Sequence, residues 1–274
     1  MKRGNIKMVE QLNNRSGSDY VIGLDVETYN GFQYPLIYDL GYCILNTKTL
    51  KIEKRVSALI TNTYKLDAFS DSVYYSAKDE RYQRLINDEA IDFMSYEEAL
   101  QGLKSDLEKY NITGIYAYNY THEKKSFKAT TALLLPDWVE WVEGINWLDA
   151  IDFIGILTEG DDYKTWCEAN DKITKSKMFI STKLEHVYQY VFNDINFIES
   201  HTGYDDAYRM LQLMYQVGLE YGLSWYGDYK AKRFIKRDID YKTKIIYLPD
   251  GSKKYVKYND IIITDDYIKL TLND

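Results

Sequence analysis

The amino-acid sequence predicts an α/β protein, with a mixed β-sheet, helices on its faces, one core and a small C-terminal β appendage. The first observation is the order of hydrophobic patterns, which runs strand, strand, strand, helix, strand, helix, helix, helix. The second is a change after Gly222, where short β-rich stretches alternate with turn residues. The 274 residues, 45% of them apolar, suffice for a domain of ~200 residues and an appendage.

Three strands open the domain. Residues 20–28 begin with a continuous apolar run that has the length of a buried central strand. Residues 36–45 and 51–60 have the composition of two more strands. The polar residues 46–49 between them form a turn, so we expect these two strands to pair as a hairpin. Together the three strands predict a meander.

Helices and short strands alternate in the middle of the chain. A helix is expected at about 95–110, because Ser95 and Glu98 have the spacing of a capping box and leucines follow at intervals of three and four residues. Residues 114–118 predict a short strand. A helix over 121–135 follows it and is ended by a proline.

The last part of the domain is predicted to be mostly helical. Residues 147–157 have the pattern of a strand or a short helix and carry Asp149 and Asp152. A helix is expected at about 182–192. Another is expected at 204–221, with an apolar stripe and a glycine at its end.

We divide the chain into a flexible lead-in (1–17), the main domain (18–221) and a basic C-terminal β-hairpin appendage (222–274). Two hairpins are predicted in the appendage: 241–248 with 253–258 around Pro249-Asp250-Gly251, and 260–264 with 267–272 around Asp265-Asp266.

The composition argues against several kinds of protein. Cys43 and Cys167 are far apart and cannot build a disulfide framework, so we interpret them as reduced thiols. The three histidines have no zinc-site spacing. The polar N-terminal residues show no signal peptide, and no stretch approaches the ~20 apolar residues that cross a bilayer. We therefore expect a cytoplasmic protein with no membrane partner.

Two pairs of residues have the spacing of a metal site. Asp25 and Glu27 lie two apart in a strand, so both side chains point to one face and repel each other unless a cation such as Mg²⁺ or Mn²⁺ lies between them. His201 precedes the last helix and Asp206 lies in its first turns, where an imidazole can take a proton from water. Each pair alone also fits a plainer alternative: surface acids at a strand end, and a capped helix beside a loop histidine.

Together, the two pairs resemble the DEDDh family of 3′–5′ exonucleases, relatives of the polymerase III proofreading subunit, oligoribonuclease and ribonuclease T. Residues 24–28 resemble the family's first motif, Asp-x-Glu-Thr, and 201–207 resemble its His-x-x-x-x-Asp motif with the Ala that follows. Residues 36–45, with Asp39-Leu40-Gly41, resemble its second strand, and Asp149 falls where the family often has an Asp-Thr pair. The resemblance covers about 18–221 and implies a ribonuclease-H-like fold with a mixed five-stranded sheet flanked by helices.

The second motif of the family is altered in this chain. The family has, roughly, Asn, two variable residues, Phe and Asp. Asn119 fits, but His122 stands in place of Phe and Glu123 in place of Asp. Glu is longer than Asp by one methylene and could still reach a metal from a shifted backbone. We therefore interpret Glu123 as the fourth metal-binding carboxylate. The alternative is an acid favoured by the helix dipole, in which case the enzyme would be weak or inactive.

The resemblance implies hydrolysis of phosphodiester bonds from a 3′ end with two Mg²⁺ or Mn²⁺ ions. One ion would be held by Asp25, Glu123 and Asp206 and would lower the pKa of a water, with His201 as the general base. The second ion, shared by Asp25 and Glu27, would stabilise the leaving oxygen.

Further residues are expected around the substrate. Thr28 and Tyr29 are predicted to lie against the terminal nucleotide, and Asn119 to orient the second-motif loop, whereas His122 and His186 are interpreted as structural. Single-stranded DNA is the substrate we favour. The alternatives are an RNA exonuclease or oligoribonuclease, and a lapsed exonuclease fold that binds nucleic acid or protein.

The net charge of −8 is unevenly distributed. Residues 229–258 hold ten basic and three acidic residues, a net +7, which leaves −15 for the rest. With its aromatic residues, this segment has the composition of an arm that follows a nucleic acid strand. The alternative is a solvated hairpin docked on the acidic body. We expect nucleic acid (a single strand or 3′ end) as the partner, replication or repair proteins as further candidates, and a phage or mobile element as the source. The predicted substrate-binding residues are Lys230, Lys232, Arg233, Lys236 and Arg237.

Overall fold

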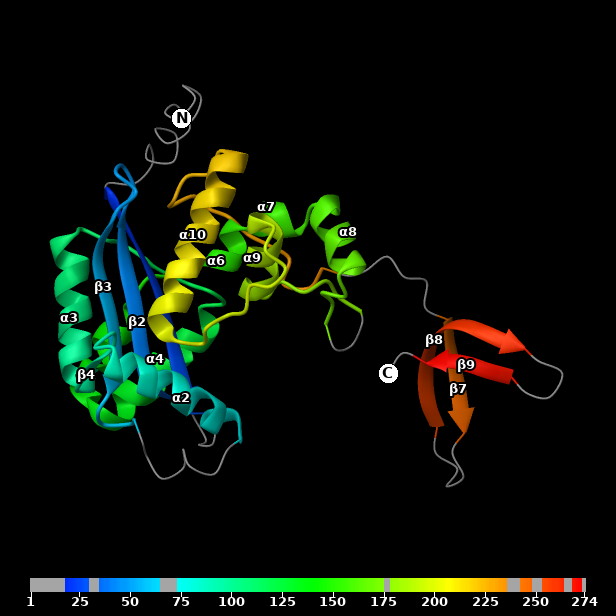
Figure 1. Ribbon diagram of the computed structural model, residues 1–274, viewed down its shortest axis with the longest axis horizontal. Coiled ribbons are helices and arrows are strands. Elements are labelled where there is room, and N and C mark those ends of the chain that lie inside the picture. Colours follow the sequence, from blue (N-terminus) through cyan, green and yellow to red (C-terminus); the bar gives the residue numbers. More distant parts are fainter. Residues whose placement is uncertain are drawn as a thin grey trace.

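The computed structural model describes residues 18–29, 35–64, 73–174, 178–235, 242–247, 253–263 and 268–272. Its centre is a mixed sheet with the strand order β4-β3-β2-β1-β5-β6 (Figure 1). The strands are β1 (Tyr20–Tyr29), β2 (Leu36–Asn46), β3 (Ile52–Ile60), β4 (Asp92–Met94), β5 (Ile115–Ala117) and β6 (Trp147–Asp149). The first three form the predicted meander and are antiparallel, whereas β4, β5 and β6 each run parallel to a neighbour.

The mixed sheet flanked by helices is confirmed, but it holds six strands instead of the expected five. The sheet ends in β4, which pairs with β3 along one edge. Asp92 and Phe93 of β4 are exposed, so this strand has no buried apolar run of the kind that marks β5. The edge strand β4 was therefore missed.

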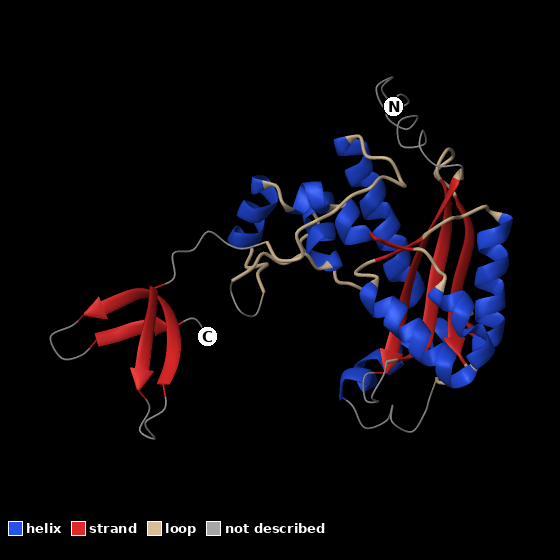
Figure 2. Cartoon of the chain, turned by 180° about the vertical axis from the view of Figure 1, so that it is seen from behind, coloured by secondary structure: helices blue, strands red, loops and turns tan. Residues whose placement is uncertain are grey.

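Helices cover both faces of the sheet (Figure 2). On one face, α10 (Gly203–Tyr221) packs against β1 and β2. Its apolar cluster also includes residues of α6 (Ala150–Phe153), α7 (Gly155–Thr158), α8 (Asp161–Ala169) and α9 (Leu184–Phe192). The second cluster, on the other face, includes residues of α3 (Tyr96–Lys109), α4 (Thr121–Leu134) and α5 (Val139–Glu143), which follows the short 3-10 turn Pro136–Trp138. Successive residues of β1, such as Val21 and Ile22, enter opposite clusters, so this strand is buried on both sides.

Several predicted element ends are confirmed. Ser95 Oγ accepts the N–H of Glu98, while the Glu98 carboxylate accepts the N–H of Ser95, which completes the capping box of α3. The helix α10 ends at Gly222, whose φ of 67° lies in the left-handed region. Residues 147–157, predicted as strand or helix, form β6 and then α6 and α7, with Asp149 as the N-cap of α6.

The helix α2 (Val73–Asn87) was not predicted, and neither were α5 and α8. The buried Tyr82 of α2 packs edge-on against Tyr38, whose ring also contacts Tyr29. The Tyr82 hydroxyl donates a hydrogen bond of 2.7 Å to Asp39 in β2. The position of α2 therefore depends on long-range contacts and not on an amphipathic pattern of its own.

The chain after α10 has two parts. Residues 223–235 pack on the domain, where Trp225 and Ile235 are buried in the same apolar cluster as α10. The strands β7 (Lys242–Tyr247), β8 (Lys253–Ile263) and β9 (Ile268–Leu272) form a second antiparallel sheet, so both predicted hairpin pairings are confirmed. The boundary after residue 221 stays a prediction.

The predicted lead-in 1–17 and the turn residues of both hairpins lie outside the described residues. In the described part of the chain, no helix is both long enough and apolar enough to span a membrane.

Candidate active site

The end of β1 carries two acidic side chains on the face that α10 covers. Asp25 and Glu27 share this face with Gly23, which lies directly under α10. In β2, Gly41 is paired with Asp25, and Asp39 with Glu27. The register of the two strands shifts directly after Glu27, and such bulges often lie beside active sites.

The N-terminus of α10 lies on the backbone of β2. The N–H of Gly203 donates to Asp39 Oδ2 at 3.0 Å. A Cβ on Gly203 would lie 2.6 Å from the nitrogen of Gly41 and 2.8 Å from the carbonyl oxygen of Asp25, so the crossing requires glycine. This approach brings the buried Asp206 close enough for its charge to raise the pKa of Asp25.

His201 lies in the loop before α10, close to these carboxylates. Ligand atoms of Glu27, His201 and Asp206 all lie within 4.8 Å of one another. Burial, followed by the charges of Lys78 and Arg81, lowers the pKa of the imidazole. The ring is therefore neutral at neutral pH and can accept a proton.

Glu123 lies in the first turn of α4 and is 3% exposed. Burial, and then the charges of Asp149 and Glu27, raise its pKa to about 8, although its own backbone N–H opposes the shift. Its charge in turn raises the pKa of Asp25. No group in the described part of the chain hydrogen-bonds to Glu123 Oε2. A buried carboxylate oxygen without a partner is costly, so the position favours a cation.

The four carboxylates act on one another as a group. Burial raises the pKa of Asp25 and of Asp206 well above the ordinary value, and neighbouring carboxylates raise both further. Burial also raises the pKa of Glu27 to about 7, although Lys78 opposes this. Such groups cannot all ionise at neutral pH without added positive charge. Because carboxylate oxygens are ligands that Mg²⁺ and Mn²⁺ prefer, these carboxylates have the chemistry of a divalent-cation site, and the ligand atoms of Glu27, His201 and Asp206 lie close enough together to share an ion.

Two charged residues at this place were not predicted from the sequence. Lys78 Nζ lies 2.7 Å from Glu27 Oε2, and the two side chains are 7% and 15% exposed. Burial and the charge of Glu185 raise the pKa of Glu199 to about 7, and the charge of Glu199 acts on the site carboxylates. Glu199 lies two residues before His201 in the sequence, and this proximity is the signal from which it could have been predicted. Lys78 lies in the unpredicted helix α2.

Three solved structures are similar to this chain. The nuclease domain of 3′hExo, a DEDDh family member bound to rAMP, is 14% identical over 78% of this chain and 98% of its own, with a TM-score of 0.47. A 3′-exonuclease recognising the 3′ end of a histone mRNA stem-loop is 13% identical over 94% and 75%, with a TM-score of 0.47. A full-length 3′-exonuclease is 13% identical over 81% and 92%, with a TM-score of 0.50.

The chain shares the fold of that full-length 3′-exonuclease, a mixed sheet flanked by helices. The expectation about fold is thereby confirmed. Comparison with protein-family models gives no match, and neither does comparison with curated protein sequences.

Thr28 and Tyr29 are both buried. Thr28 Oγ1 lies 3.2 Å from His122 Nε2, which agrees with a structural role for that histidine. Tyr29 is 1% exposed, with its ring centre 4.8 Å from that of Tyr38. Tyr29 is therefore packed in the core, and its contact with a nucleotide stays a prediction. His186 is held by a 2.8 Å contact to a serine hydroxyl, as a structural residue would be.

Asn119 lies in the turn before α4, and its φ of 65° is in the left-handed region that asparagine tolerates. Its N–H donates to Asp149 Oδ1 at 3.3 Å. The other oxygen of Asp149 pairs with Arg233 at 2.8 Å. Asp149 thus ties the turn before α4 to the segment that follows α10.

Two residues of the predicted basic arm form ion pairs with acidic residues of the same chain. Lys232 pairs with Glu159 at 3.2 Å, and Arg233 also reaches Asp152 at 3.4 Å. These pairs agree, for Lys232 and Arg233, with the alternative of a segment docked on the acidic body. Lys230 is exposed, and its contact with a substrate stays a prediction. Two members of the predicted set lie outside the described residues: Lys236 and Arg237.

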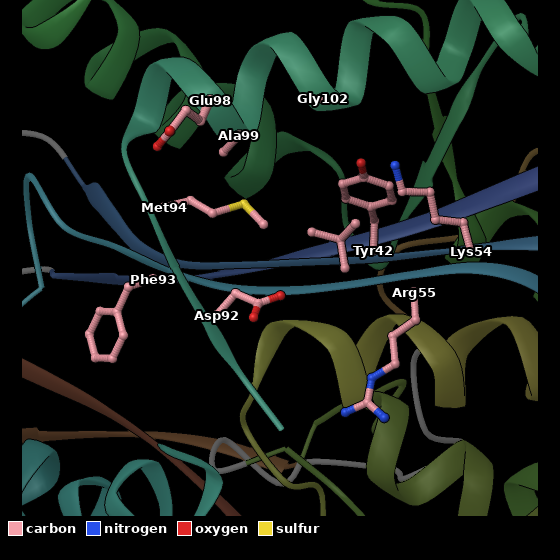
Figure 3. Close-up of a pocket in the computed structure, with 10 residues that line it drawn as sticks. Tyr42, Lys54, Arg55, Asp92, Phe93, Met94, Glu98, Ala99 and Gly102 are labelled. Carbon is pink, nitrogen blue, oxygen red and sulfur yellow. The ribbon is translucent and has the colours of Figure 1, made fainter. Parts of the chain in front are cut away.

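A separate groove of about 430 Å³ lies between α3 and the β3–β4 edge of the sheet (Figure 3). Tyr42 and Lys54 point toward α3, whereas Arg55 points to the other side of the strand. Tyr42 and Lys54 both bind the buried Asp106, at 2.6 and 2.7 Å. None of the predicted site residues lines this groove, so it is distinct from the carboxylate site.

Proposed function

We propose that this chain is a divalent-metal-dependent 3′–5′ exonuclease that hydrolyses phosphodiester bonds, with single-stranded DNA as its favoured substrate. The observation that carries the proposal is the convergence of four carboxylates, from β1, α4 and α10, beside one neutral histidine. The exonuclease fold supports it. The resemblance of residues 24–28 and 201–207 to the family's motifs supports it from the sequence.

Asp25, Glu123 and Asp206 would hold a divalent cation, as the partnerless oxygen of Glu123 suggests. When bound, such a cation lowers the pKa of water and neutralises charge that develops on the phosphate. Ser200 donates to Asp206 Oδ1 at 3.1 Å and holds that carboxylate in place. Such outer contacts fix the orientation of ligands.

His201 is the proposed general base. Its neutral ring accepts the proton of the attacking water, and a base of this kind contributes roughly 10²–10⁴-fold to a rate. Its ligand atom lies within 4.8 Å of those of Glu27 and Asp206, so a water bound at these carboxylates would be near the ring. The lowered pKa keeps the ring ready to accept a proton.

The test uses 5′-labelled single strands of DNA and RNA, each with Mg²⁺ or Mn²⁺. We expect stepwise shortening from the 3′ end, lost in Asp25→Ala and in Asp206→Ala. Asp205→Ala is the matched control, since this neighbouring acid is no ligand in the proposed site and acts on Asp206 only weakly through its charge, so it should keep activity. Cleavage in the interior of the strand, or no cleavage by a folded protein, contradicts the proposal. If only the RNA strand is shortened, the preferred substrate is RNA instead of DNA, and the proposed exonuclease reaction still holds.

A further inference from the structure

The segment after α10 is fastened to the domain on both sides of Arg233. Before it, the N–H of Ala231 donates to Asp152 Oδ1 at 3.0 Å. After it, the carbonyl oxygen of Ile235 accepts the N–H of Ile180 at 2.9 Å. The Arg233 side chain therefore extends from a backbone that is fixed at both ends.

The Arg233 guanidinium binds a buried carboxylate at the end of β6. Its Nη2 lies 2.8 Å from Asp149 Oδ2, and the Asp149 side chain is only 1% exposed. The same nitrogen lies 3.4 Å from Asp152 Oδ1, in α6. A buried carboxylate is costly unless it is paired, so the guanidinium offsets the burial of Asp149 and holds its orientation.

The second oxygen of this carboxylate holds the turn between β5 and α4. Asp149 Oδ1 accepts the N–H of Asn119 at 3.3 Å and the N–H of Ile151 at 2.8 Å. The φ of Asn119 is 65°. Left-handed backbone at a residue other than glycine persists only where the surrounding structure fixes it. The bond from Asn119 to Asp149 is a contact of that kind.

The turn at Asn119 leads directly into the helix that carries Glu123. The helix α4 begins at Thr121, and Glu123 lies in its first turn, four residues after Asn119. The carbonyl oxygen of Asn119 also accepts the N–H of His122 at 3.1 Å. The conformation of the turn therefore sets where the Glu123 carboxylate enters the site, in which its charge acts on Asp25.

We propose that Arg233 is a positioning residue of the carboxylate site, which acts through Asp149 on the turn that carries Glu123. This inference rests on the proposed exonuclease function, because it takes Glu123 as a ligand of a divalent ion. It gives Arg233 a role different from the contact with substrate that the sequence predicts. Outer contacts of this kind fix the orientation of metal ligands, and their loss typically weakens metal binding by roughly 10–100-fold.

Charge and position make opposite predictions for Arg233→Met. By charge alone, loss of a positive residue near the site strengthens the binding of a cation. By position, the same change should weaken Mn²⁺ binding by roughly 10–100-fold. Because Arg233→Met leaves a buried carboxylate unpaired, a second variant combines it with Asp149→Asn and so removes both charges. This double variant should also bind Mn²⁺ more weakly, whereas charge alone predicts little change.

Titration of the folded full chain with Mn²⁺, without nucleic acid, measures this affinity through the electron paramagnetic resonance signal of the free ion. Asp152→Asn is the matched control. Asp152 is the other carboxylate that Arg233 reaches, and its contacts in the described part of the chain are with the segment after α10 and not with the turn at Asn119. This variant should bind Mn²⁺ as the wild type does.

Unchanged or tighter Mn²⁺ binding by folded Arg233→Met overturns the inference, and the double variant decides in the same way if the single variant does not fold. An equal loss in Asp152→Asn also overturns it. Weaker binding of a labelled single strand, with the Mn²⁺ affinity intact, would return Arg233 to the predicted contact with substrate.

The proposed function fails differently. A wild type that shortens strands, with no loss of Mn²⁺ affinity in the variants, keeps the exonuclease function and loses this inference. A wild type that shortens no strand, but whose Mn²⁺ binding weakens in both variants, keeps the role of Arg233 at the metal site and loses the exonuclease function. A wild type that binds no Mn²⁺ and shortens no strand loses both.

Discussion

Gly41 is the point at which β2 meets the N-terminus of α10, and Gly41→Ala tests whether this contact builds the site. A Cβ at residue 41 would lie 2.5 Å from Tyr204 Cα and closer still to both atoms of the bond between Gly203 and Tyr204. Atoms in ordinary contact lie about 3.5–4.0 Å apart, so the start of α10 must shift by roughly 1.5 Å or more to clear the two nearer atoms.

Both partners in this contact are backbone, so neither can rotate away. Overpacking typically costs about 1–3 kcal/mol, and we expect a loss near 3 kcal/mol from a total stability of about 5–15 kcal/mol. The same shift moves Asp206 relative to Asp25. We therefore expect Mg²⁺ affinity to fall by roughly 10–100-fold, the usual effect of disturbing the support of a metal ligand.

Urea unfolding measures the first effect and titration calorimetry with Mg²⁺ measures the second. Gly102→Ala in α3 is the matched control, because its Cβ would meet only Tyr42 Oη, at an ordinary 3.9 Å. Alanine in that helix should stabilise the protein by up to about 1 kcal/mol. An unchanged urea midpoint in Gly41→Ala, or an equal loss in Gly102→Ala, would refute the reasoning.

Three other perturbations act on the same region. Without divalent metal, the free energy of unfolding should fall as pH rises from the ordinary 4.5 toward 8, because folding raises the pKa of Glu27 to about 7 and of Glu123 to about 8 and so favours their protonated forms. Thermal melts with and without Mg²⁺ measure this, and a melting temperature that rises with pH contradicts it. Glu123→Gln removes one charge at nearly constant shape, so calorimetry should show weaker Mg²⁺ binding and melts a flatter pH profile. Tyr82→Phe removes the donor to Asp39 and should cost about 1–3 kcal/mol in urea unfolding, whereas no change would mean that the bond adds nothing.

Elements with a local signal were predictable from the sequence. The capping box of Ser95 and Glu98 marked the start of α3, and Gly222 marked the end of α10. The two-residue spacing of Asp25 and Glu27 placed both on one face of β1, since strand side chains alternate. These features depend on neighbours within a few positions, and the sequence shows such neighbours directly.

Features set by distant contacts were not predictable. The contacts that place α2 join Tyr82 to Asp39 and Lys78 to Glu27, residues 43 and 51 positions apart. Nothing marks Lys78 among the 34 lysines and arginines of the chain. Tyr29 was predicted beside a substrate because it follows the metal motif, yet its packing against Tyr38 across the sheet decides its burial.

Asp39 has a consequence for the order in which the molecule folds. Its oxygen accepts bonds from Tyr82 and from Gly203, which is 164 residues further along the chain. The meander of β1, β2 and β3 can form early because its contacts are local, whereas closure of this junction waits for α10. A growing or partly unfolded chain therefore lacks the assembled carboxylates of the proposed cation site. Divalent ions should bind only the completed domain and stabilise it as a whole, to a degree set by their concentration relative to Kd.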